Sequence, residues 1–189
     1  KGSAKFLWGD DQLKGKKIFI QGIGNVGRNL INYLQKEDAV ILINDIKKEK
    51  LEEIKKQYNV EVLSNEEMFN EKIDIYSPCA LGATLNNQTI PKLTCSIVAG
   101  AANNQLEEEG VHDIMLKNKN ILYAPDFLIN AGGLINVYSE LKNFDQAKSL
   151  SKTEEIYNTT IAILDKSKEE NISSHAAALS IAQDRLRSS

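Results

Sequence analysis

The chain has 189 residues, of which 42% are hydrophobic and 26% charged, and its formal net charge is −3. This composition is typical of one globular domain that buries a core without disulfides or metal ions. The charge gives no general attraction to nucleic acid or to an anionic membrane, and no apolar run approaches membrane-spanning length. No signal peptide is visible, and Cys79 and Cys95 form neither a disulfide framework nor a metal-ligand spacing, so we expect a cytoplasmic protein.

The first residues, 1–15, are predicted to be the end of a helix followed by a polar turn. Because the chain begins at Lys1 rather than at methionine, we expect it to be part of a longer protein.

Residues 16–45 are predicted to form a strand, a glycine turn, a helix and a second strand. The apolar run 18–20 is followed by Gly22, Gly24 and Gly27, which have the spacing G-x-G-x-x-G. In dinucleotide-binding folds the first glycine allows a tight turn and the second lets the backbone approach a pyrophosphate. The third lets the helix pack closely on the strand. A purely structural turn is the alternative.

The helix after the glycines is predicted to be amphipathic, with Val26, Leu30, Ile31 and Leu34 on its apolar face. Its N-terminus would face the phosphates. The second strand ends at Asp45, roughly twenty residues beyond the glycines, where this fold places a carboxylate for the adenosine ribose hydroxyls. Asp45 is also a candidate N-cap for the next helix, and the two roles are compatible.

Beyond Asp45 the pattern alternates between strands and helices. It predicts an α/β fold, a Rossmann doubly wound and mostly parallel sheet with helices on both faces and further helices appended at the C-terminus. The lysines of the first of these helices alternate with glutamates, which favours a solvated face over a nucleic-acid patch. The predicted helices are 46–58, a short one around 68–69 with a Ser64/Glu67 capping box, 106–117, 134–141, 146–168 and 173–186, and the predicted strands are 60–62, 73–77, 97–99 and 121–124.

Two loops that follow predicted strands, 78–82 and 100–105, are candidates to line a ligand site, because ligands bind beyond the carboxyl ends of strands in open α/β sheets. Cys79 lies in the first loop without a histidine nearby in sequence, so a packing role is favoured over a nucleophile. Asn103 and Asn104 in the second loop suit hydrogen bonding to a ribose or a carboxamide, or they simply form a turn. His112 is predicted to be a surface residue, and His175 a capping or surface residue at the start of the last helix.

Five motifs in one order resemble the NAD-binding domain of the amino-acid dehydrogenases, most closely the leucine enzymes: GIGNVG, IND, SPCALG, AGAANNQL and APDFLINAGG. The resemblance extends to the phenylalanine and valine enzymes and, more distantly, to glutamate dehydrogenase, and it covers nearly the whole chain. This chain departs from the family at Ala83, where a second glycine is common. The resemblance implies reversible oxidative deamination of an L-amino acid, of the branched-chain, leucine-like type, to the 2-oxoacid, ammonia and NADH.

The resemblance also implies the residues that bind the NAD cofactor. These residues are grouped by the part of the cofactor that each would contact. The implied set is Gly22, Ile23, Gly24, Asn25, Val26, Gly27 and Arg28 around the pyrophosphate, Asp45 at the adenosine ribose with Ile46 flanking the adenine, Cys79 and Ala80 along the cofactor, Ala101 and Asn103 near the nicotinamide ribose, and Asn130 where the nicotinamide meets the substrate.

By the same resemblance, 1–15 is the end of an inter-domain helix and linker, 16–145 is the NAD-binding domain, and 146–189 packs toward an N-terminal catalytic domain that this chain lacks. The family's catalytic lysines and acid belong to that domain, so we expect no catalytic residue here. The candidate bases that remain, Lys142, Lys148 and the two histidines, lie on predicted helices.

We expect no metal site, no nucleic-acid partner and no membrane partner, and a parent protein that is a homo-oligomer binding NAD and a small amino acid. Two alternatives stay open. The chain could be a stand-alone NAD-binding or sensing module, or part of another Rossmann dehydrogenase such as a hydroxyacid enzyme.

Overall fold

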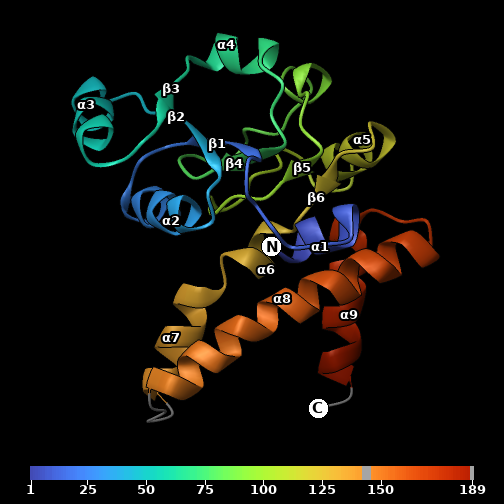
Figure 1. Cartoon of the computed structure of the whole chain (residues 1–189). Helices are drawn as coiled ribbons and strands as arrows, with labels where there is room; N and C mark the ends of the chain where they lie inside the picture. Colours follow the sequence, from blue (N-terminus) through green and yellow to red (C-terminus); the bar gives the residue numbers. More distant parts are fainter. Residues whose placement is uncertain (142–145, 188–189) are drawn as a thin grey trace.

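The computed structural model describes residues 1–141 and 146–187. Its six strands form one sheet in the order β3-β2-β1-β4-β5-β6, and every pairing is parallel (Figure 1). This is the doubly wound Rossmann order, which reverses between β1 and β4. The predicted fold class is therefore confirmed. The strands are β1 (Lys17–Gln21), β2 (Val40–Asn44), β3 (Glu61–Val62), β4 (Ile75–Pro78), β5 (Ile97–Val98) and β6 (Leu122–Tyr123).

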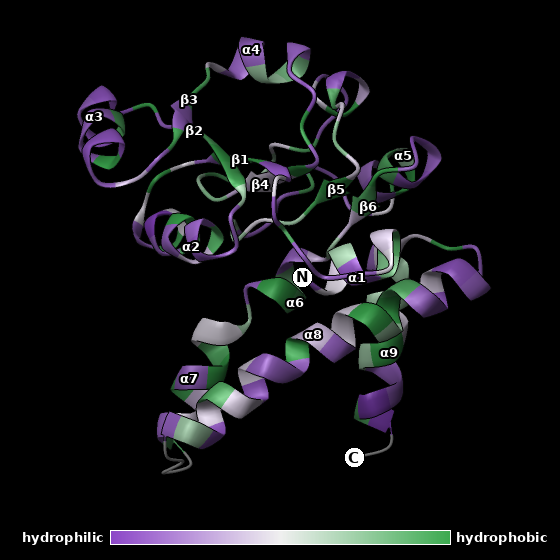
Figure 2. Ribbon diagram, viewed as in Figure 1, coloured by the Kyte–Doolittle hydropathy of each residue, from purple (hydrophilic) through white to green (hydrophobic). Residues whose placement is uncertain are grey.

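Two hydrophobic cores lie on opposite faces of the sheet, because successive side chains of a strand point to opposite sides. Ile18 and Ile20 of β1 belong to one core and Phe19, between them, to the other. Figure 2 shows hydrophobic stretches in β1, β5 and β6, while much of α3 (Lys48–Gln57) is hydrophilic. Helices α2 (Asn25–Lys36) and α3 contribute to the first core, and α4 (Asn65–Asn70), the 3-10 turn η1 (Ile90–Lys92) and α5 (His112–Asn118) to the second.

The remaining helices form a separate layer below the sheet in Figure 1. Helix α8 packs against α1, α7 and α9, and Ile163, Ala177 and Ala178 form a small core between α8 and α9. The predicted C-terminal helices are thus present, although the predicted boundary at 145 and the last two residues lie outside the described residues. The helices are α1 (Gly2–Trp8), α6 (Asp126–Ile129), α7 (Gly132–Leu141), α8 (Gln146–Glu169) and α9 (Ser174–Arg187).

The predicted capping box at the start of α4 is confirmed. The Glu67 backbone N–H donates to Ser64 Oγ at 3.1 Å, and the Ser64 N–H donates to Glu67 Oε2 at 2.7 Å. These two bonds satisfy donors that a helix N-terminus leaves free. The bond from the Ser64 N–H also lowers the pKa of the Glu67 carboxyl.

Several predictions about elements and burial were wrong. The helix predicted over 106–117 begins only at His112, because Leu106 instead pairs with Leu85 in an isolated parallel bridge. His112 is buried, since its ring turns inward and Nδ1 accepts a hydrogen bond from the Glu108 N–H at 2.9 Å. Val26, predicted on the buried face, is 55% exposed because it lies in the first turn of α2, at the end of the sheet.

Within 1–141 and 146–187, no helix has the length and apolar character needed to cross a membrane. Over the same residues, no cluster of three or more His, Cys, Asp or Glu side chains is arranged to hold a metal ion.

Candidate functional site

The glycine turn between β1 and α2 is tightly packed at its first and third glycines. Gly22 has φ +103°, and a β-carbon there would lie 2.5 Å from Ala80 Cβ. A β-carbon on Gly27 would lie 2.2 Å from the Gly22 carbonyl oxygen. Both positions favour glycine, because the left-handed φ of Gly22 strains any other residue and a side chain at Gly27 would force the backbone to shift.

The middle glycine is open to solvent. Gly24 is the N-cap of α2, its backbone is extended, and a β-carbon built on it would meet nothing within 4 Å. Asn25 and Val26 beside it are also exposed, and the first turn of α2 carries no acidic side chain. The free N–H groups and positive dipole end of a helix attract an anion, so this arrangement leaves room for a phosphate group above Gly24.

Asp45 connects the end of β2 to the glycine turn. Its Oδ2 accepts a hydrogen bond from the Ile23 N–H at 2.7 Å, and its Oδ1 accepts one from the Lys47 N–H at 2.9 Å. Partial burial opposes ionisation of the carboxyl, but the two N–H groups outweigh it and lower the pKa of Asp45. The N-cap of α3 is Lys47, so Asp45 is not the cap residue itself, and Ile46 next to it is 92% exposed. A carboxylate oxygen has further lone pairs, so it can accept a ribose hydroxyl as well.

Arg28, expected beside the pyrophosphate, is already paired with another side chain. Its Nη1 donates to Glu53 Oε1 of α3 at 2.8 Å, and this bond raises the pKa of Arg28 and lowers the pKa of Glu53. A contact between Arg28 and a phosphate would have to compete with that ion pair.

The loops after β4 and β5 pack directly on each other. A β-carbon on Gly100 would lie 2.2 Å from the Pro78 carbonyl oxygen, and the Ala102 N–H donates to the same oxygen at 2.9 Å. Farther along, the Ala83 N–H donates to the Asn104 carbonyl oxygen at 2.7 Å. These contacts bring the segments that carry four predicted site residues to one end of the sheet, namely Cys79, Ala80, Ala101 and Asn103.

The two cysteines lie in different environments. Cys79 is half-buried, with Sγ 3.4 Å from Ser77 Oγ, whereas Cys95 is buried in the core, where burial raises the pKa of its thiol to about 12. Cys95 is therefore a packing residue of the core.

Asn103 and Asn130 are brought together by the fold. The Asn130 Nδ2 group donates to Asn103 Oδ1 at 2.6 Å, which joins the loop after β5 to the end of α6. An open cavity of about 530 Å³ adjoins this pair. Its lining is Asn103, Asn104, Glu109, Asp126, Phe127, Asn130, Ala131 and Leu134.

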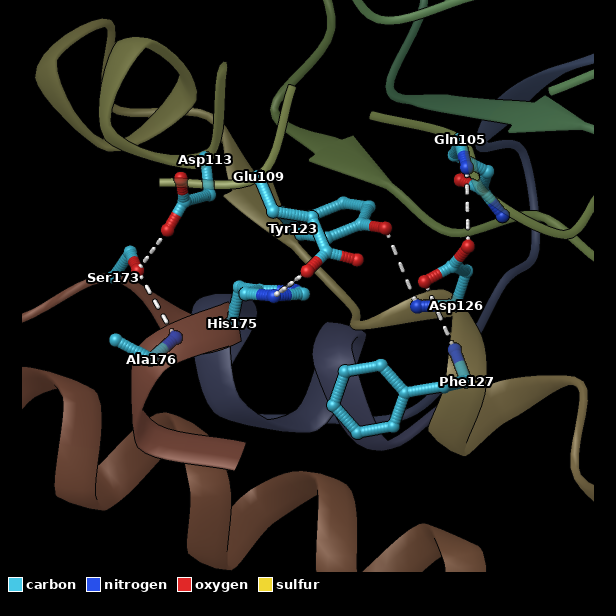
Figure 3. Close-up of polar contacts among 9 residues, drawn as sticks. All are labelled: Gln105, Glu109, Asp113, Tyr123, Asp126, Phe127, Ser173, His175 and Ala176. Carbon is cyan, nitrogen blue, oxygen red and sulfur yellow. Dashed lines mark hydrogen bonds and ion pairs between the residues drawn. The ribbon is translucent and has the colours of Figure 1, made fainter. Parts of the chain in front are cut away.

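Sequence reasoning missed the acidic residues of this cavity and the histidine behind it. Figure 3 shows Asp126 between the backbone of Gln105 and that of Phe127, and His175 facing Glu109. The predicted surface position of His175 is wrong. It is 3% exposed, with Nε2 3.4 Å from Glu109 Oε2 and its ring edge-on to Phe127 at 5.5 Å.

A signal for Asp126 was present in the sequence, because this acidic residue follows the end of β6 by three positions, much as Asp45 follows the end of β2. No local signal marked Glu109 or His175, since the packing of distant segments brings Glu109 to the cavity and places His175 behind it. Of the four candidate bases, Lys142 lies outside the described residues, and His112, Lys148 and His175 do not line the cavity.

The fold and the glycine turn define a Rossmann-type α/β domain with its candidate site at the carboxyl ends of the strands. The family model of the Glutamate/Leucine/Phenylalanine/Valine dehydrogenases matches residues 37–188, and the chain belongs to this family.

Individual relatives agree with that assignment. L-tryptophan dehydrogenase of Nostoc punctiforme is 44% identical over 100% of this chain and 54% of its own length. The crystal structure of that enzyme superposes with a TM-score of 0.97 at 43% identity, over 100% of this chain and 57% of the solved one. Leucine dehydrogenase of Thermoactinomyces intermedius is 40% identical over 98% of this chain and 50% of its own length. The chain thus spans about half the length of the curated relatives it matches.

Proposed function

We propose that this chain is the NAD-binding part of an amino-acid dehydrogenase. The observation that carries the proposal is the open N-terminus of α2 at Gly24, held beside the Asp45 carboxylate at the carboxyl end of the sheet. A dinucleotide needs an anion site and a ribose acceptor at this spacing, and the turn offers both. Membership in a dehydrogenase family supports the same conclusion.

The cofactor would run from the β2 end of the sheet toward β6. Its adenosine ribose hydroxyls would donate to the Asp45 carboxylate, its pyrophosphate would lie on Gly24–Val26, and its nicotinamide half would reach the Asn103–Asn130 pair. NAD is favoured over NADP because a ribose phosphate beside the Asp45 carboxylate would place like charges together. At an effective dielectric constant near 20, such a repulsion is worth on the order of a few kcal/mol at contact distance. The side chains of Lys47 and Lys48 argue for NADP instead, because their positive charges would attract that phosphate.

The reaction we propose is the oxidative deamination of an L-amino acid, with a leucine-like side chain as the first choice. NAD supplies the hydride acceptor when bound. The described residues that line the cavity beside Asn130 include carboxylates and amides but no cationic side chain to hold the carboxylate of an amino acid. We therefore propose that residues 16–145 bind the cofactor and that 1–15 and 146–189 link this domain to a separate catalytic domain. We further propose that the parent protein is a cytoplasmic homo-oligomer.

Calorimetric titration with NADH tests the cofactor assignment. In the variant Gly24→Val the new side chain projects into the open space above the turn, so NADH affinity should fall at least about tenfold. The matched control is Tyr33→Val, which changes an exposed residue farther along the same helix and should bind NADH as the wild type does. Unchanged affinity in Gly24→Val would remove the glycine turn from the cofactor site.

Parallel titrations with NADPH test the choice of cofactor. The wild-type chain should bind NADH more tightly than NADPH at moderate salt. Equal affinities would show that Asp45 does not select against the phosphate.

A further inference from the structure

Asp126 is a buried carboxylate that joins the two segments on either side of the cavity. It is 7% exposed, its Oδ2 accepts a hydrogen bond from the Gln105 N–H at 3.0 Å, and its Oδ1 accepts one from the Phe127 N–H at 2.9 Å. Both carboxylate oxygens are thus occupied by backbone donors. One donor belongs to the loop after β5 and the other to α6 (Figure 3).

The loop that Asp126 holds is itself closed by a buried amide. Gln105 is fully buried, and its Nε2 group donates to the carbonyl oxygens of Gly100 at 2.6 Å and Ala102 at 2.9 Å. These two bonds tie residues 100, 102 and 105 of the loop together. The bond from the Gln105 N–H to the Asp126 carboxylate attaches this loop to the start of α6.

The two segments joined by Asp126 carry one asparagine each. Asn103 lies in the closed loop, and Asn130 ends α6 and donates its backbone N–H to the Asp126 carbonyl oxygen at 2.9 Å. Their side chains meet at 2.6 Å at the edge of the cavity. Asp126 is therefore hydrogen-bonded to the segment of each asparagine, through Gln105 in the loop of Asn103 and through the backbone of Asn130 itself.

We propose that Asp126 is a positioning residue for the nicotinamide half of the cofactor: it clamps loop 100–105 to α6 and so sets the geometry of the Asn103–Asn130 pair. This inference rests on the proposed function. It assigns Asp126 no contact with the cofactor and no proton transfer. Its effect should therefore be confined to ligands that reach the asparagine pair.

The test compares NADH with ADP, which has the adenosine and both phosphates but no nicotinamide half. In Asp126→Asn one carboxylate oxygen becomes an NH₂ group that cannot accept from its backbone donor. Affinity for NADH should fall about tenfold, as expected when a buried charged hydrogen bond that orders a site is lost, and affinity for ADP should change less than about twofold.

The matched control is Asp113→Asn, the same chemical change at a carboxyl that is also buried. Asp113 Oδ2 accepts from Ser173 Oγ, and neither residue lines the cavity. This variant should leave the affinities for NADH and ADP unchanged. A double variant, Asp126→Asn with Asn103→Ala, should bind NADH about as weakly as Asn103→Ala alone, because the clamp acts through Asn103.

A measurement on the wild-type chain covers the case in which Asp126→Asn does not fold. The ¹⁵N and ¹H shifts of the Gln105 and Phe127 amides should move on titration with NADH and much less with ADP.

Equal loss of NADH and ADP affinity in Asp126→Asn, an unchanged NADH affinity, or amide shifts of the same size with both ligands would each overturn the positioning role. A wild-type chain that binds neither nucleotide would overturn the proposed function as well, so the two failures are distinguishable.

Discussion

Replacement of Gly27 by alanine tests the tightest contact in the glycine turn. The added β-carbon would lie 2.2 Å from the Gly22 carbonyl oxygen, a backbone atom that has no rotamer by which to move away. The backbone of Gly22 also has little room to move, since it has a positive φ and lies against Ala80. To relieve the overlap, α2 must move away from the end of β1.

The size of the effect follows from two opposing contributions. Overpacking of a close contact typically destabilises the folded state by about 1–3 kcal/mol. The higher helix propensity of alanine offsets about 1 kcal/mol of this cost. Because the 2.2 Å overlap is with a backbone atom, we take the upper part of the overpacking range, about 2–3 kcal/mol, and expect a net loss of about 1–2 kcal/mol in the free energy of unfolding. For a chain of this length each kcal/mol lowers Tm by about 2–4 °C, so Tm should fall by about 2–8 °C.

Thermal unfolding followed by circular dichroism measures this loss, with Gly24→Ala as the matched control three residues earlier in the chain. Gly24 has space for a β-carbon and no positive φ, so loss of the glycine N-cap and the lower entropy of the unfolded chain nearly cancel, to within about 0.5 kcal/mol. If Gly27→Ala melted at the temperature of Gly24→Ala, the third glycine would not be required for packing.

Three further outcomes are expected. The lowered pKa of Asp45 means that its ionised form stabilises the fold above the ordinary range of an aspartate carboxyl, about 4, and that this contribution is lost as pH falls through the folded-state pKa. Asp45→Asn should therefore lose less stability than the wild type on acidification, and parallel acid-unfolding curves would contradict this. In the folded chain at pH 8 a thiol reagent should modify Cys79 and spare Cys95, whose buried thiol reacts only after denaturation; modification of both at one rate would be inconsistent with the buried position. The chain alone should bind NADH but not reduce NAD with leucine, valine or phenylalanine, as followed by NADH absorbance, because hydride transfer requires an amino acid held in place and a base. Turnover would place the whole reaction within these residues.

Sequence alone determined the features of this protein that depend on near neighbours in the chain. The alternation of apolar runs and helical periodicity predicted the strands and most helices, since the periods of two and 3.6 residues are local properties. The glycine turn and the Ser64/Glu67 capping box were predicted for the same reason, because each is formed by residues only a few positions apart. The motif order was sufficient to indicate the family.

Tertiary structure alone decided which polar groups come together in the cavity. The hydrogen bond between Asn103 and Asn130 spans 27 residues, and the one between Gln105 and Asp126 spans 21. His175 is buried because α9 returns to the sheet and places the histidine against Phe127, although its neighbours in sequence resemble those of a surface residue. Such contacts form where the carboxyl ends of strands lie together, and the packing of whole helices and strands sets the distance between the polar groups. No local pattern carries that information.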